Sequence, residues 1–114
     1  MSTIYQILHQ ASGNERLFAV DFRIDAAWTK SASDYWLFEL FLRTAGEEIG
    51  KRLGTLSLQE RSIAAKTDIA VYVGGDVGVA LADGDAVVCK TTRTGSPVAL
   101  VAPGFIPDWA AVSK

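Results

Sequence analysis

The sequence has a single histidine, His9, and a single cysteine, Cys89, among its 114 residues. One cysteine cannot form a disulfide within the chain, and a zinc site needs several Cys or His ligands, so both kinds of cross-link are excluded. A catalytic triad would have to use His9 as its base, because no other imidazole is present. We expect His9 to be a polar residue on a strand face and Cys89, which lies in an apolar run, to be a small buried hydrophobic residue.

Basic residues are not in excess, since 11 Lys and Arg stand against 13 Asp and Glu, giving a net charge of −2. Nucleic acid selects basic faces, so we expect no nucleic-acid partner. No apolar run approaches the roughly 20 residues of a membrane span, and the first residues lack the pattern of a signal peptide. We therefore expect no membrane partner and a location in the cytoplasm, or in a particle assembled there.

Motifs for phosphate or calcium are incomplete. Residues 74–78 are glycine-rich and follow an apolar run, but the lysine of a phosphate loop is missing. Asp83 and Asp85 flank Gly84, but the closing glutamate of a twelve-residue calcium loop is missing. We interpret both segments as turns, and we predict no catalytic residue, no metal and no cofactor.

Hydrophobic residues make up 49% of the chain and occur in short runs with a periodicity of two residues. In the clearest run, residues 17–24, alternation predicts four side chains that are buried together on one strand face: Phe18, Val20, Phe22 and Ile24. Asp21 and Arg23 fall on the opposite, exposed face. Residues 4–8 are predicted to be the partner strand, in a hairpin whose turn is residues 12–15.

The second half of the chain contains further short apolar runs separated by turn residues. The predicted strands are residues 55–59, 69–73, 77–81, 86–91 and 98–102. Asp83 and Gly84 separate two of these runs and predict a hairpin, because a type I′ turn needs positive φ at its central residues. Turn signals at roughly 8–12-residue spacing are typical of a sandwich or barrel.

The segment 31–54 fits both a helix and a hairpin. For the helix, Ser31 or Ser33 would be the N-cap, and charged residues recur every four positions. Gly46 and Gly50 inside that helix would each cost about 0.5–1 kcal/mol relative to alanine. If the segment is instead a hairpin with its turn at 44–47, four apolar side chains point toward the core: Trp36, Phe38, Leu40 and Leu42. Aromatic density favours the hairpin.

These patterns predict one domain over residues 1–114 that is mainly β, an antiparallel sandwich or flattened barrel of short strands. The alternative is an α+β fold in which one helix, residues 32–53, packs on a curved antiparallel sheet. Residues 103–114 are predicted to form an extended C-terminal segment, because Pro103 and Pro107 disfavour a helix there.

Large apolar side chains in a predicted loop and in this extended segment are the candidate interface residues: Trp28, Phe105, Ile106 and Trp109. Such a segment either packs over the edge of its own core or contacts another subunit. The first hypothesis is a non-enzymatic binding or assembly module, a subunit of a homo-oligomer or of a larger particle, for instance a viral structural or tail component. Its expected partner is another copy of the chain or a partner protein. The alternatives are a small-molecule-binding α+β domain or enzyme with a pocket between helix and sheet, and a carbohydrate-binding module that stacks sugars on Trp28 and Trp109.

Overall fold

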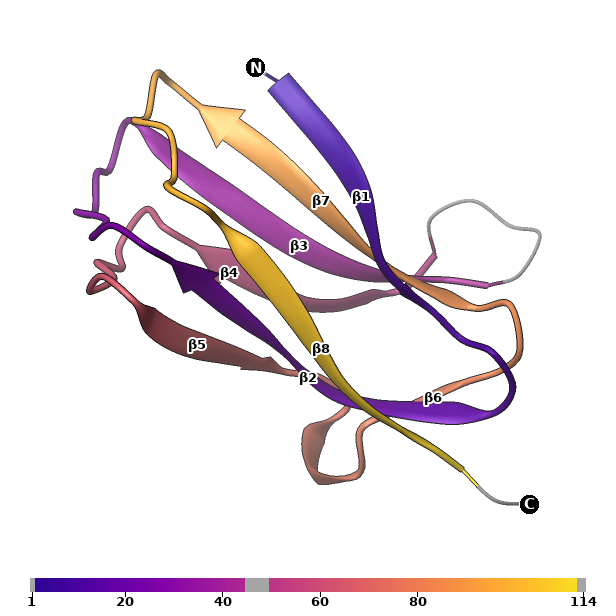
Figure 1. Ribbon diagram of the computed structural model, residues 1–114. Coiled ribbons are helices and arrows are strands. Elements are labelled where there is room, and N and C mark those ends of the chain that lie inside the picture. Colours follow the sequence, from indigo (N-terminus) through magenta and orange to yellow (C-terminus); the bar gives the residue numbers. More distant parts are fainter. Residues whose placement is uncertain (1, 45–49, 113–114) are drawn as a thin grey trace.

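Two antiparallel sheets pack face to face across an apolar core (Figure 1). The computed structural model describes residues 2–44 and 50–112. The strands are β1 (Ser2–Gln10), β2 (Glu15–Ile24), β3 (Tyr35–Arg43), β4 (Arg52–Ser57), β5 (Thr67–Tyr72), β6 (Val79–Leu81), β7 (Ala86–Thr94) and β8 (Gly104–Ala111), with a 3₁₀ turn η1 (Gly75–Val77). The first sheet has the order β1-β7-β3-β4. In the second, β2 pairs with β8 along one edge and with β5 and β6 along the other. The prediction of a mainly β, sandwich-like fold is confirmed.

The segment that fitted both a helix and a hairpin is a hairpin. β3 pairs antiparallel with β4 on one side and with β7 on the other, and Phe38 and Leu40 are buried between the sheets. Trp36 and Leu42 are partly buried against the same core. The helix predicted as the alternative for residues 32–53 is therefore wrong, while most of the predicted turn at 44–47 lies outside the described residues. Among the described residues, we find no α-helix whose length and hydropathy suit a membrane span.

The predicted hairpin between the first two strands is wrong. β1 pairs with β7 in the first sheet, whereas β2 lies in the second, so the turn between them carries the chain across the sandwich. The turn at Asp83 and Gly84 is present, but it too joins strands of different sheets, β6 and β7. The two crossing segments bond to each other instead: the Ala11 amide donates to the Asp85 carbonyl at 2.7 Å, and the Gly84 amide donates to the Ala11 carbonyl at 3.0 Å.

A β-bulge in β2 changes which side chains face the core. Val20, Phe22 and Ile24 are completely buried as predicted, but Phe18 is 36% exposed. The register between β2 and β8 shifts between Leu17 and Ala19, so that Phe18 is the extra residue and the buried face continues through Leu17. The prediction that Phe18 is buried with the other three is therefore wrong.

The last strand lies later in the sequence than predicted. Residues 98–102 form a loop instead of a strand, and the strand is β8, inside the segment that was predicted to be extended. Pro107 pairs with Val20, and it is tolerated because β8 is an edge strand whose outer side needs no donor. The other predicted strands of the second half are present with shifted ends, as β4, β5, β6 and β7.

Three phenylalanine rings from β2, β3 and β8 connect the two sheets. The Phe22 ring from β2 lies 5.0 Å from the Phe38 ring of β3 and 4.9 Å from the Phe105 ring of β8, measured between centroids. Phe38 and Phe105 contact each other edge-on at 5.2 Å. Tilted and edge-on pairs at this spacing are favourable arrangements of aromatic rings. The cluster therefore fixes how β8 sits over the first sheet.

Candidate functional site

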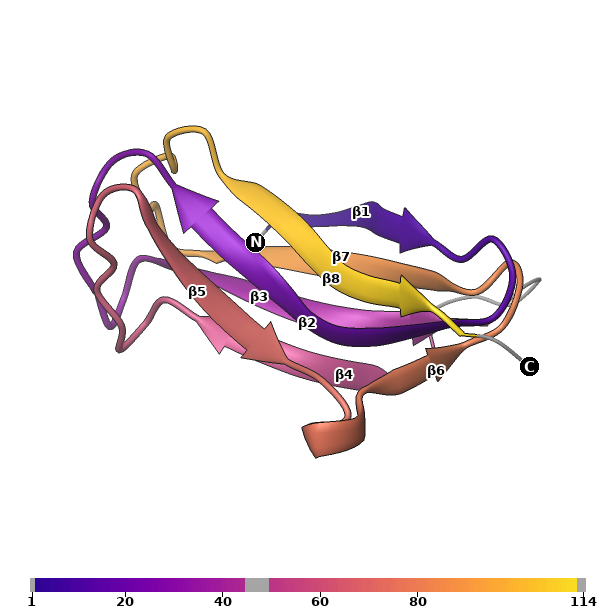
Figure 2. The same cartoon turned by 60° about the horizontal axis from the view of Figure 1, so that its bottom comes forward.

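The most distinctive surface of the molecule is the side on which the edge strands β1 and β8 face each other, which we call the seam. The two strands belong to different sheets and lie next to each other without pairing (Figure 2). One end of the seam, near residues 9 and 109, is closed by side-chain contacts. The other end, near residues 4 and 105, opens into a pocket.

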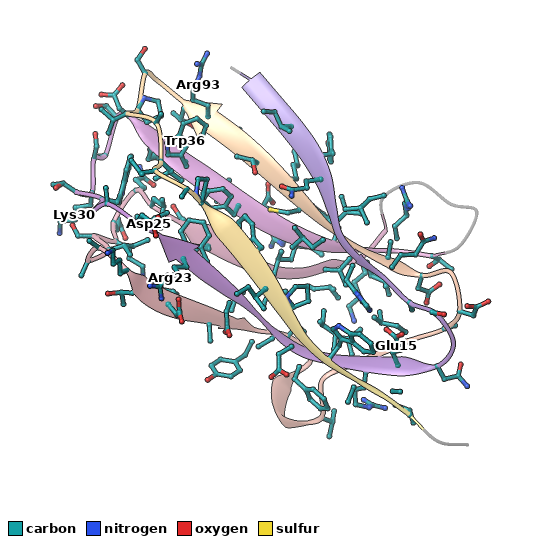
Figure 3. All side chains as sticks on the ribbon, in the orientation of Figure 1. Glu15, Arg23, Asp25, Lys30, Trp36 and Arg93 are labelled. Atoms are coloured by element: carbon teal, nitrogen blue, oxygen red, sulfur yellow. The ribbon has the colours of Figure 1, made fainter. Side chains whose placement is uncertain are left out.

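The closed end is built from three side chains of three strands. His9 Nε2 in β1 lies 2.5 Å from Glu15 Oε1 in β2, and the Trp109 ring of β8 stacks on the imidazole with 4.5 Å between centroids. Figure 3 labels Glu15 on its strand, β2. The Glu15 side chain is only 3% exposed, and its Oε2 accepts a hydrogen bond from the Ser12 amide at 3.0 Å. A register shift after Ile7 separates His9 from the outward-facing side chains of β1. The histidine that was predicted to be a polar residue on a strand face thus forms a part-buried hydrogen bond with Glu15 and stacks on Trp109.

The environment of Glu15 favours its charged form. The hydrogen bond with His9 is the main cause that holds the pKa of this carboxyl group below its usual value. Burial acts in the opposite direction, while the Ser12 amide and the charge of His9 add to the lowering. Glu15 is therefore ionised at neutral pH and ties β1 to β2 in the folded state.

The hydrogen bond between His9 and Glu15 should make the stability of the fold depend on pH. Because the folded-state pKa of Glu15 is lowered, its contribution to stability is present above its ordinary pKa of 4.5 and is lost as the pH falls through the folded-state pKa. Between about pH 6 and about pH 3, we expect the wild type to lose more free energy of unfolding than Glu15→Gln, measured by urea denaturation. Glu60→Gln, at an exposed position, is the control and should follow the wild type. Equal losses in the wild type and in Glu15→Gln would contradict the role given to this carboxylate.

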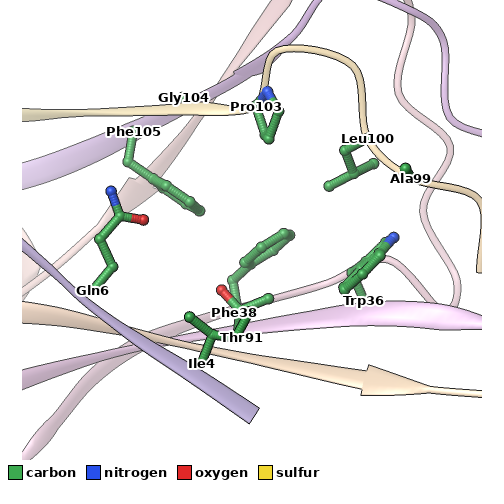
Figure 4. A pocket seen from close by; sticks show the side chains of 10 residues that line it. All are labelled: Ile4, Gln6, Trp36, Phe38, Thr91, Ala99, Leu100, Pro103, Gly104 and Phe105. Atoms are coloured by element: carbon green, nitrogen blue, oxygen red, sulfur yellow. The ribbon is translucent and has the colours of Figure 1, made fainter. Parts of the chain in front are cut away.

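The open end of the seam is an apolar pocket of about 340 Å³ between the two sheets (Figure 4). Its lining residues come from β1, β3, β7, the start of β8 and the preceding loop: Ile4, Gln6, Trp36, Phe38, Thr91, Ala99, Leu100, Pro103, Gly104 and Phe105. The Trp36 indole nitrogen donates to the Val98 carbonyl at 3.0 Å, which holds the loop before β8 beside the pocket. Gln6 and Thr91 provide polar groups in an otherwise apolar wall.

The four predicted interface residues have very different surroundings. Trp28 is 3% exposed in the core, where its indole nitrogen donates to the Leu58 carbonyl at 3.0 Å. Phe105 is partly buried and forms both core and pocket wall. Ile106 and Trp109 are 62% and 42% exposed, so these two present apolar area at the surface. The strand β8 carries Phe105, Ile106 and Trp109. Trp28 lies in the segment between β2 and β3, where it forms an isolated β-bridge with Ile63.

Cys89 is buried, as predicted, with 1% of its surface exposed. Burial raises the pKa of its thiol to about 11, and the contact of Sγ with the Thr91 hydroxyl at 3.9 Å acts weakly in the other direction. The thiol is therefore protonated at neutral pH and is a poor nucleophile. Within residues 2–44 and 50–112, no three His, Cys, Asp or Glu side chains come together as a metal site.

Sequence reasoning missed the exposed apolar residues of β1, namely Ile4, Tyr5 and Ile7. The available signal was that this predicted strand carries no charged residue, which is unusual for a strand at the edge of a sheet. The chain matches no protein-family model, no curated protein and no solved structure at a significant level. The candidate functional site is therefore the seam, on its geometry alone.

Proposed function

We propose that this domain is a non-enzymatic assembly module, a subunit of a homo-oligomer or larger particle, and that the seam and its flanks are its contact surface. The supporting observation is where exposed apolar side chains lie. Most of the large ones belong to β1, to β8 and the residue after it, or to the loop before β8: Ile4, Tyr5, Ile7, Val98, Val101, Ile106, Trp109 and Val112. Concentrated apolar exposure of this kind marks protein contact surfaces.

The setting that we propose is the cytoplasm or a particle assembled there, and a viral structural or tail component is one concrete instance. The chain carries a net charge of −2, so copies of it repel each other weakly. Assembly of many copies through apolar contacts is compatible with that charge.

The pocket supports a second candidate function, the binding of a small apolar ligand. Its walls are apolar and two polar side chains, Gln6 and Thr91, would orient a ligand. It lies between two sheets, and not between a helix and a sheet as the α+β alternative required. The carbohydrate alternative loses one of its two stacking platforms, because Trp28 is buried.

The assembly proposal is tested by the mass of the protein in solution. We expect sedimentation velocity to give a mass above the 12.2 kDa of one chain, and the double variant Ile7→Ser/Ile106→Ser to shift it towards one chain. The matched control is Val77→Ser in η1, because Val77 is 68% exposed but lies outside the seam and its flanks. Removing apolar area from a contact weakens it by about 25 cal/mol per Å².

Two results would count against the assembly proposal. A wild-type chain that stays monomeric would contradict assembly of like subunits and leave the pocket as the candidate site. An oligomer that resists the double variant but is dissociated by Val77→Ser would place the contact away from the seam.

A further inference from the structure

We propose that β1 pairs antiparallel with β1 of a second copy, so that the first sheets of two subunits join across a two-fold axis into one continuous sheet. This inference rests on the proposed function and names the partner and the geometry of its contact.

The edges of the two sheets are not equally protected against pairing. β4 begins with Arg52 directly after Lys51, and β8 contains Pro107 and Asp108. β5 carries Asp68, and β6, which shares its edge, is only three residues long. Charges, prolines and short strands are the usual means by which proteins prevent edge-to-edge association. Each of these edges therefore has a protective feature.

β1 has none of these features. Its nine residues, Ser2–Gln10, contain no Asp, Glu, Lys, Arg or Pro. Its inner edge pairs with β7, while its outer edge pairs with no other strand of the described chain. Tyr5 and Ile7 are 53% and 50% exposed, so apolar side chains flank this unpaired edge. A long, uncharged and partly apolar edge strand is a template for another strand.

The contacts of the seam locate the free part of β1. After the register shift that follows Ile7, the imidazole of His9 stacks on the Trp109 ring and forms a hydrogen bond with Glu15. Before it, residues 2–7 run beside the open pocket, where Ile4 and Gln6 form part of the wall. We therefore place the pairing on residues 2–7.

A second copy fits this edge better than an unrelated peptide for two reasons. An antiparallel pair of identical strands is self-complementary, since each contact between two positions occurs twice across the two-fold axis. In addition, no charged residue would oppose another, whereas like charges opposite each other destabilise a strand pair. The inner positions Ile4 and Gln6 would continue the pocket-lining layer across the axis, and Tyr5 and Ile7 would continue the outer layer.

The test compares two exposed tyrosines on edge strands. Tyr5→Lys puts a charge on each side of the proposed axis, and we expect the dissociation constant of the dimer to rise at least about tenfold. Tyr72→Lys is the matched control, because Tyr72 is 75% exposed on β5 and should leave the dimer unchanged. Sedimentation velocity from about 1 μM to about 1 mM covers the range in which small interfaces dissociate.

A second measurement reports on the strand directly. Hydrogen exchange of the wild type should show amides of β1 gaining protection as concentration rises, with the amides of β4, the other edge of the same sheet, unchanged. An oligomer that survives Tyr5→Lys, or that protects β8 instead of β1, overturns the β1 pairing and leaves the assembly proposal standing. Protection of β4 instead of β1 overturns the β1 pairing and also places the contact away from the seam. A wild type that remains monomeric over the whole range overturns both.

Discussion

Phe22→Ala is expected to lower the free energy of unfolding by about 3–5 kcal/mol. The Phe22 side chain is completely buried, and its ring contacts Phe38 of the opposite sheet and Phe105 of the edge strand β8. Its loss leaves a cavity at the point where three strands meet. Since a domain of this size is stable by about 5–15 kcal/mol, the variant should unfold at much lower urea concentration, which tryptophan fluorescence can follow.

Phe18→Ala is the control, because Phe18 is the same residue type, four positions earlier in the same strand. It sits in the bulge and is 36% exposed, so its removal should cost at most about 1 kcal/mol. The alternating pattern alone predicts equal losses for the two variants. Equal losses in the experiment would therefore show that β2 has no bulge at Phe18.

The bulge illustrates what could be predicted from the sequence and what could not. Alternation along residues 17–24 predicts a strand with one buried face, and three of the four predicted side chains are buried. The exception depends on the register between β2 and β8, whose residues are about ninety positions apart in the chain. A local pattern carries no information about such a register.

The positions of these turns were predicted correctly, but the strands that they connect were not. The residues at 12–14 and 83–84 specify a reversal of the chain, and both reversals occur. Whether the chain returns beside the strand that it left or crosses to the other sheet depends on where the remaining strands pack. In this fold the two crossing segments are stabilised by hydrogen bonds to each other between Ala11 and residues 84–85, a contact that no short-range rule foresees.

The candidate site was also predicted only in part, because it too depends on which distant strands lie side by side. Ile106 and Trp109 were identified because they are large apolar residues in an extended, proline-containing segment, and both keep substantial exposure. Ile4, Tyr5 and Ile7 were missed, because the predicted pairing with the next strand hid the fact that β1 is an edge. Edge status is a property of the topology, and it decides which uncharged strand is exposed.

Trp28 was predicted to share the role of Trp109, and substitution should separate the two. Trp28→Ala is expected to cost about 3–5 kcal/mol, because it empties a buried site and removes the donor to the Leu58 carbonyl. Trp28→Phe keeps most of the ring but leaves that carbonyl unpaired, at a cost of about 1–3 kcal/mol. Trp109→Ala removes a partly exposed ring stacked on His9, a contact worth about 0.5–1.5 kcal/mol.

The two positions should also differ in their effect on assembly, which makes the comparison independent of stability. Trp28→Phe, which is expected to remain folded, should leave the mass in solution unchanged, because its side chain lies inside the subunit. Trp109→Ala should shift that mass towards one chain, because 42% of this residue is exposed along the seam. Urea denaturation and sedimentation velocity on the same preparations give both quantities. If Trp28→Phe weakens association and Trp109→Ala does not, the contact surface lies near the loop that follows β2, on the buried tryptophan's side of the sandwich, and the seam loses its role.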